Sequence, residues 1–408
     1  MGIHDLSIAL LIPVFLVLLS RGANLKHLAS LPFLLFSLYV GLILLVPLIG
    51  IAFIPQASIS MYFGDLRWLY IIAMVVSATV VYQRLGLELF ERHLQFFLIV
   101  AISVVWLVLL PQIYMQVSGA SPPRIVRFWY PEGRSGPSFG FHIFRFAGPF
   151  GAISALSTFG VVLYGAGLFS RNRGLSNLYI FVSGLMFALA SGGRTGFIAI
   201  FILTFAFVLV SLFRRRISVR GTFFFLLMAI SVFVLLSVAV NLNLGRLESG
   251  RIQSTFQFIG GETTLYEVGG RGGQRWSEPL EESQRWSRFG TLVNSSNALD
   301  LPAFDSYYIF LLAQAGWIII IPFLMAVGFS FLTLWRSNVG NPSLGNSFAL
   351  AVVIILPIFG ITQNTMTGLL GRVLLGIAMM ILLLNQIKAF RGALNHSVPA
   401  GIAQTKRA

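Results

Sequence analysis

Hydrophobic segments of membrane-spanning length follow one another along most of this chain, which restricts it to folds that a lipid bilayer can hold. Of its 408 residues, 57% are hydrophobic and 10% are charged, a composition too apolar for a soluble globular protein. We expect spanning helices at residues 6–20, 28–50, 68–82, 94–117, 149–169, 177–190, 196–213, 222–242, 306–334, 347–361 and 370–387. The sequence therefore predicts an all-α, polytopic integral membrane protein with about 11 transmembrane helices.

The connections between these segments fall into two alternating sets that differ in charge. One set is basic throughout, and it contains the run Arg214–Arg216 and the C-terminal tail. Cytoplasmic loops of membrane proteins carry such an excess of Lys and Arg, so we assign this set to the cytoplasm and the N-terminus to the outside. The net charge of +15 follows from this pattern, and it needs no nucleic-acid partner to explain it.

One outward connection, residues 243–305, is far longer than the others. It is rich in glycine and contains six arginines and eight carboxylates but no lysine. A connection of this length is uncommon unless it carries function or folds on its own. It divides the chain into helices 1–8 at 1–242, a large periplasmic loop at 243–305, helices 9–11 at 306–390 and a cytoplasmic tail at 391–408.

A second outward connection, residues 118–148, combines arginines with many aromatic side chains. Its one carboxylate is Glu132, and its arginines are Arg124, Arg127, Arg134 and Arg145. The planar guanidinium contacts phosphate through two N–H groups and stays charged in any environment. Snorkelling to lipid headgroups explains one or two such arginines. Four of them among aromatic rings favour an anionic, amphipathic ligand such as a diphosphate-linked lipid, and we expect Arg127 and Arg134 to bind it.

The sequence Ser191-Gly-Gly-Arg194-Thr-Gly196 forms almost the whole connection between two expected helices. An arginine at the edge of the hydrocarbon is costly unless it is paired or faces a cavity. The glycines beside it let a ligand or a second backbone approach closely. Arg194 is therefore a candidate ligand for a diphosphate, and a tight turn with a snorkelling arginine is the alternative.

A four-residue sequence is repeated inside the long loop, where Gln274-Arg275-Trp276-Ser277 recurs as Gln284-Arg285-Trp286-Ser287. On a helix the two copies would lie about 80° apart and line one broad face. Tryptophan beside arginine suits a sugar ring next to a phosphate, which makes Arg275, Trp276 and Arg285 candidates. An amphipathic helix on the membrane surface is the alternative explanation.

The long loop re-enters the membrane at Asp305-Ser306-Tyr307-Tyr308. Asp305 is a candidate general base for a sugar hydroxyl, and capping of the following helix is the alternative role. Asp65 and Glu132, in other outward connections, compete for the role of base. We expect Tyr307, Tyr308 and Asp65 to contact substrate.

Several catalytic motifs are absent from the sequence. The chain has no cysteine, and its five histidines are scattered without an HExxH motif, so no zinc-hydrolase site is expected. There is no Walker lysine loop and no Asp-x-Asp, which argues against an ATP motor and a metal-dependent nucleotide-sugar transferase. No expected helix carries a mid-span carboxylate of the kind that proton-coupled transporters use. We expect chemistry without a metal or a cofactor.

Together these features resemble the O-antigen polymerase (Wzy-type) and O-antigen ligase superfamily of bacterial inner membranes. The layout is similar over most of residues 120–335, with ten or more helices and one long periplasmic loop late in the chain. Arg145-Phe-Ala-Gly148-Pro-Phe-Gly151 resembles the family's arginine–glycine element, and residues 191–196 resemble its serine–arginine–glycine element. Asp305-Ser306-Tyr307, followed by Gly316-Trp317, resembles the re-entry motif, where ligases tend to carry His-Asn or His-Ser. That difference favours a polymerase.

The resemblance implies a glycosyltransferase C-like fold and metal-independent glycosyl transfer at the periplasmic face. Donor and acceptor would both be undecaprenyl-diphosphate-linked glycans, and a polysaccharide chain-length regulator is a candidate partner besides membrane lipids. Stabilisation of the leaving diphosphate is expected from four arginines: Arg145, Arg194, Arg275 and Arg288. Asp305 or Asp65 would act as the base. Two alternatives stay open: an O-antigen ligase that transfers the glycan to lipid A-core, and a flippase or transporter of lipid-linked oligosaccharide.

Overall fold

All the regular structure in the described residues is helical, in agreement with the expected fold class. The computed structural model describes residues 30–53, 65–118, 148–150, 153–171, 174–191, 194–213, 290–292, 306–362 and 368–397. In chain order the elements are α2 (Leu31–Phe53), α4 (Arg67–Leu85), α5 (Leu87–Ser118), the 3-10 turn η3 (Gly148–Phe150), α7 (Ile153–Phe169), α8 (Leu175–Ala190), α9 (Arg194–Phe213), α13 (Tyr307–Ala315), α14 (Trp317–Gly340), α15 (Leu344–Thr362) and α16 (Leu369–Ser397).

Eight of the eleven expected segments each overlap one of these helices, and a ninth, 306–334, is divided between two of them. The other two, 6–20 and 222–242, lie outside the described residues. Six helices in the described part are long and apolar enough to cross a membrane: Leu31–Gly50, Arg67–Leu85, Leu87–Tyr114, Trp317–Gly340, Leu344–Ile361 and Leu369–Ile387. Three shorter apolar helices accompany them: Ser154–Phe169, Leu175–Ala190 and Thr195–Val208. The chain is therefore an α-helical membrane protein.

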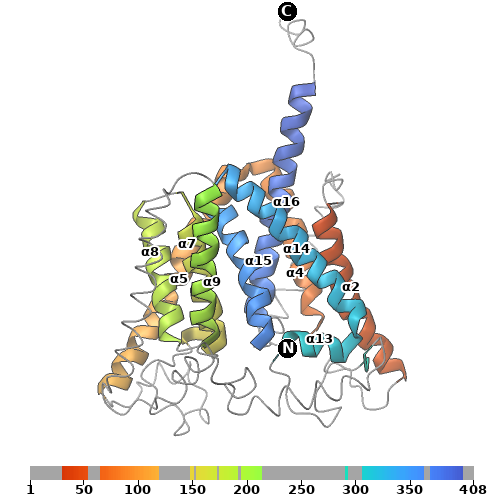
Figure 1. The fold of residues 1–408 in the computed structure, drawn as a ribbon, viewed down its shortest axis with the longest axis horizontal. Helices are drawn as coiled ribbons and strands as arrows, with labels where there is room; N and C mark the ends of the chain where they lie inside the picture. Colours follow the sequence, from red (N-terminus) through yellow and green to blue (C-terminus); the bar gives the residue numbers. More distant parts are fainter. Residues whose placement is uncertain are drawn as a thin grey trace, which may run out of the picture.

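The expected single helix at 306–334 is wrong, because two helices, α13 and α14, meet there at Gly316. Gly316 has φ 62° and ψ −152°, a backbone conformation that is essentially restricted to glycine. Figure 1 shows α13 lying across one end of the bundle, with α14 rising from it. The residues on both sides of Gly316 are apolar, so hydropathy alone does not reveal the bend.

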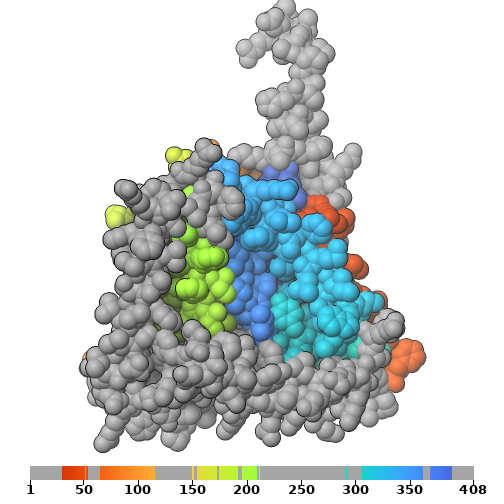
Figure 2. Space-filling model, in the orientation of Figure 1, coloured from red at the N-terminus to blue at the C-terminus, as the bar shows by residue number. Residues whose placement is uncertain are grey.

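The centre of the bundle is held together by close helix packing. α7 packs most extensively against α8 and α15. A Cβ atom added at Gly160 or at Gly184 would overlap the backbone of the partner helix, so α7 and α8 cross at the short range that small residues permit. Much of α15 and α16 is buried, whereas α5 and α14 expose apolar side chains such as Leu107 and Leu324. Figure 2 shows the face that α9, α14 and α15 form. Exposed apolar surface of this extent is what a protein surrounded by lipid is expected to have.

The two ends of the bundle differ. At one end α13 lies against α2 and α15, and α4 and α16 begin beside it (Figure 1). The described helices α2, α5 and α15 end on this side, at residues 53, 118 and 362, where the sequence predicts outward connections, so we call this the loop-bearing end. At the opposite end the described connections are short: Gly86 joins α4 to α5, and residues 341–343 join α14 to α15. Glu91 of α5 fastens the start of α15 there, since its carboxylate accepts hydrogen bonds from Ser343 Oγ (2.6 Å) and Gly345 N (2.9 Å).

The bend between α13 and α14 gives a stability prediction. Gly316→Ala places a side chain in a glycine-only conformation, and we expect it to lower the free energy of unfolding by about 1–3 kcal/mol. Gly328→Ala is the matched control, because Gly328 lies inside α14 and an added Cβ meets no atom within 4 Å. The thermal midpoint of detergent-purified protein measures both variants. Equal midpoints would contradict the requirement for glycine at the bend.

Candidate functional site

A buried arginine marks the loop-bearing end. Arg372 lies in the first turn of α16, within an otherwise apolar span, and its side chain is 3% exposed. A charged group in such a position is expensive unless it is paired, and such residues mark functional sites more often than others do. Arg372 was not among the residues predicted from the sequence. A check of each expected helix for an isolated charge would have found it, because it lies inside the expected segment 370–387.

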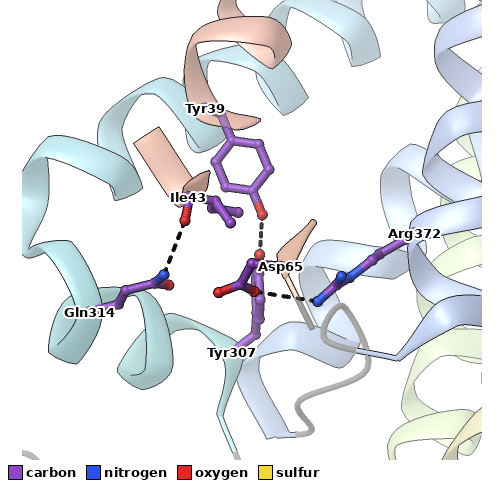
Figure 3. Close-up of polar contacts among 6 residues, drawn as sticks. All are labelled: Tyr39, Ile43, Asp65, Tyr307, Gln314 and Arg372. Carbon is purple, nitrogen blue, oxygen red and sulfur yellow. Dashed lines mark hydrogen bonds and ion pairs between the residues drawn. The ribbon is translucent and has the colours of Figure 1, made fainter. Parts of the chain in front are cut away.

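Two residues of the α4 region hold the guanidinium of Arg372. The Asp65 Oδ1 atom lies 3.7 Å from Arg372 Nη2, and the Asp65 side chain is 7% exposed (Figure 3). Trp68, one turn further along α4, presents its ring face, whose centroid is 5.1 Å from Arg372 Cζ. An ion pair and a cation–π contact therefore compensate one buried charge together.

Two tyrosines complete the group of polar residues. The hydroxyls of Tyr39 on α2 and Tyr307 on α13 are hydrogen-bonded to each other, and both side chains are fully buried (Figure 3). The Tyr39 ring packs edge-on against Trp68, with centroids 5.6 Å apart. Tyr39, Asp65, Trp68, Tyr307 and Arg372 thus form one cluster, which we call the Arg372 cluster.

The position of α13 determines where Tyr307 lies. At the start of α13, Ser306 Oγ donates to Gly360 O and Tyr308 OH donates to Pro357 O, each at 3.2 Å, which fixes this end to α15. Near its other end, Gln314 Nε2 donates to Ile43 O of α2 at 3.4 Å (Figure 3). α13 lies outside the six candidate spans, and burial raises the pKa of Tyr308 to about 12 and that of Tyr307 well above its usual range. Both phenols therefore stay protonated at neutral pH.

The Arg372 cluster has the chemistry of an anion site with a base beside it. A guanidinium in a low-dielectric surrounding attracts an anion more strongly than it would in water. Asp65 is a carboxylate that can accept a proton, and the paired hydroxyls can bond to an oxygen-rich ligand. Among the described residues, no group of three or more His, Cys, Asp or Glu could hold a metal ion.

The structure brings two of the predicted site residues together, although 242 positions separate them in the sequence. Asp65 and Tyr307 both belong to the Arg372 cluster. Tyr308 is adjacent, but its hydroxyl bonds to α15. Tyr39 and Trp68 were missed, because aromatic residues in apolar helices give no signal that separates them from core or lipid-facing residues.

Two of the expected motifs reach the described residues at α13 and at α9. The N-cap of α13 is Ser306, whereas the preceding Asp305, a candidate base or helix cap, lies outside the described residues. Gly196 contacts Ser157 of α7 so closely that a Cβ atom would overlap its hydroxyl, which gives this glycine a helix-packing role. Arg194 begins α9, and its side chain is outside the described part. The other predicted residues also lie outside the described residues: Arg127, Arg134, Arg145, Arg275, Trp276, Arg285, Arg288 and Asp305.

The buried ion pair predicts coupled effects on stability. Asp65→Asn leaves the buried Arg372 guanidinium without its carboxylate, and Arg372→Gln leaves the buried Asp65 carboxylate without its cation. Each substitution should therefore destabilise the protein by about 3–5 kcal/mol. The double variant should lose less than the sum of the two. Chemical unfolding in detergent measures all three, with the exposed Arg67→Gln as a near-neutral control. Strict additivity would show that the two charges do not depend on each other.

Comparisons with known proteins do not decide what this site does. No protein-family model matches the chain, and no curated protein matches it. The chemistry of the Arg372 cluster and the motifs of the sequence are therefore the basis for assigning a function.

Proposed function

We propose that this protein polymerises undecaprenyl-diphosphate-linked oligosaccharide repeat units into O-antigen polysaccharide by metal-independent glycosyl transfer. The loop-bearing end would face the periplasm from the bacterial inner membrane, within a glycosyltransferase C-like fold. The observation that carries the proposal is the buried Arg372 cluster. It lies at the end of the bundle where α5 leads into the arginine-rich connection 118–148 and where residues 290–292 of the long connection 243–305 contact α13. Positive charge, a carboxylate and hydroxyl groups are what this transfer requires at one place.

The proposed reaction breaks the bond between the anomeric carbon of the donor glycan and its diphosphate. A new bond forms from that carbon to a hydroxyl oxygen of the acceptor sugar. The leaving diphosphate gains negative charge, which Arg372 stabilises without the need for a metal, since a preorganised cation in a water-poor site acts on the transition state. Arg145, Arg194, Arg275 and Arg288 remain candidates for the same role from the surrounding connections.

The proton of the acceptor hydroxyl needs a base. Asp65 is the best placed carboxylate in the described part, because it already lies against the cation that would hold the diphosphate. When the diphosphate takes over the guanidinium, Asp65 is left to accept the proton. Tyr307 would then donate a hydrogen bond to a sugar oxygen, and Asp305 is the alternative base.

The distribution of polar groups favours an enzyme over a flippase. A flippase needs a polar path that opens to both ends of the bundle. Here the Arg372 cluster lies at one end, while α7, α8 and α15 pack closely in the centre. The ligase stays the nearest alternative, because it would use the same donor and the same leaving group.

Glycan length in a deletion strain separates these functions. A strain that lacks this gene should produce lipopolysaccharide with a single O-antigen repeat, because attachment proceeds but polymerisation does not. Electrophoresis of lipopolysaccharide measures the outcome, and re-expression of the wild-type chain should restore the ladder. A complete loss of attached glycan would contradict the polymerase and favour a ligase or a flippase.

The role of the guanidinium is tested by Arg372→Lys. Lysine keeps the positive charge opposite Asp65, so the protein should accumulate normally, but it lacks the planar fork that contacts a diphosphate bidentately. We expect polymer formation to fall by about tenfold or more, equal to about 1.4 kcal/mol in the transition state. Arg67→Lys is the control, since Arg67 is an exposed arginine two residues from Asp65. A normal amount of polymer from the Arg372→Lys variant would show that Arg372 has only a structural role.

A further inference from the structure

A short piece of the long loop is seated between α2 and α13. Residues 290–292 lie against the C-terminal end of α13, where Thr291 N and Thr291 Oγ1 both donate to Ala313 O, at 2.7 and 2.8 Å. The next amide, Leu292 N, donates to Gln314 O at 3.0 Å. The Leu292 side chain packs against the hydrophobic core. This piece of the loop is therefore bound to the bundle through its backbone as well as its side chains.

The backbones around residues 290–292 approach one another closely on both sides. A Cβ atom at Gly50 of α2 would overlap the Leu292 carbonyl oxygen. A Cβ atom at Gly290 would come within 2.6 Å of Gly316 N and 2.7 Å of Ala313 O. Gly290 has φ 71°, and Leu292 has φ 60°, which a leucine adopts only when its surroundings impose it. The fit thus depends on glycine at two positions from distant parts of the chain.

These contacts supply what α13 lacks by itself. A helix of nine residues is too short to be stable in isolation. The last carbonyls of a helix have no partner inside it, and Thr291 and Leu292 provide donors for two carbonyls in the last turn of α13. Gln314 also connects the seated segment to α2, because its carbonyl accepts from Leu292 while its side chain donates to Ile43 O.

The same contacts lead to the Arg372 cluster. Ile43 lies one turn of α2 away from Tyr39, whose hydroxyl bonds to Tyr307 at the other end of α13. If α13 moved away from α2, the two hydroxyls would separate and Tyr307 would leave the surroundings of Arg372. The seated segment therefore acts on the site through α13, without touching it.

We propose that residues 290–292 are a positioning segment, which locks α13 against α2 and thereby holds Tyr307 in the Arg372 cluster during glycosyl transfer. This inference rests on the proposed function for its catalytic consequence. The docking of residues 290–292, meaning their contacts with α2 and α13, does not depend on any function. Thr291, Leu292 and Gly50 are positioning residues, and none of them contacts the reacting atoms.

Docking is tested without reference to activity. The chain has no native cysteine, so Leu292→Cys introduces a single, half-buried thiol. Its reaction with a maleimide should be slow in the otherwise wild-type protein and clearly faster when Gly50→Ala is added. Gly41→Ala is the matched control on the same helix, because a Cβ atom there meets nothing within 4 Å. Equal labelling rates in the Gly50→Ala and Gly41→Ala backgrounds would overturn the docking.

The positioning role is tested by measuring the kinetics of polymer formation in variants that do not carry the labelling cysteine. Gly50→Ala should lower kcat for polymer formation by about tenfold or more with a nearly unchanged KM for the donor, since misplacement of a catalytic group affects the chemical step. Gly41→Ala should behave as wild type. Thr291→Val removes the hydroxyl donor without adding bulk and should also lower kcat. Thr291→Ser keeps the hydroxyl and should keep the wild-type kcat.

The outcomes separate the two proposals. Faster labelling with unchanged kcat would overturn the positioning role, although the segment docks. A wild-type protein that forms no polymer from lipid-linked repeat units would refute the proposed function and, with it, the catalytic consequence of positioning. The labelling experiment would still decide whether residues 290–292 are docked.

Discussion

The arrangement of the loop-bearing end depends on the compensation of one buried charge. The Arg372 guanidinium lies inside an apolar span, where an unpaired charge would be strongly unfavourable. Asp65 and Trp68 compensate it from one side, and the tyrosine hydroxyls lie close by. Arg372 belongs to α16, and these partners belong to α2, to α13, and to α4 with the residues just before it, so the requirement to satisfy one cation brings four helices together.

The bend at Gly316 makes this convergence possible. A straight helix from residue 306 onward would carry Tyr307 away from α2, whereas α13 lies across the end of the bundle and presents Tyr307 to Tyr39. Contacts to α15 hold one end of α13, and residues 290–292 hold the other. The long loop is therefore part of the architecture of the site at one described point, and the site combines segments from the start, middle and end of the chain.

Hydropathy predicted where most of the described helices lie, because length and apolarity are what a bilayer demands of a spanning segment. It could not predict the bend, since Ala315, Gly316 and Trp317 continue an apolar run and only the backbone angle at Gly316 distinguishes them. Asp65 and Tyr307 were predicted as site residues because polar groups near helix ends are conspicuous. Arg372 was missed because an average over an apolar segment hides a single charge, and its partner Asp65 is distant in sequence. The glycine of the 191–196 motif that is described, Gly196, serves helix packing, a role that sequence alone does not separate from ligand binding.

A central role for Arg372 is tested most directly by the position of a bound lipid diphosphate. A cryo-electron-microscopy structure of the protein in lipid nanodiscs with undecaprenyl diphosphate should show phosphate oxygens within about 3 Å of the Arg372 guanidinium, the length of a charge-assisted hydrogen bond. Asp65 should at the same time have moved out of contact with Arg372. A diphosphate bound beyond hydrogen-bond range of Arg372, with the Asp65–Arg372 pair intact, would contradict this role.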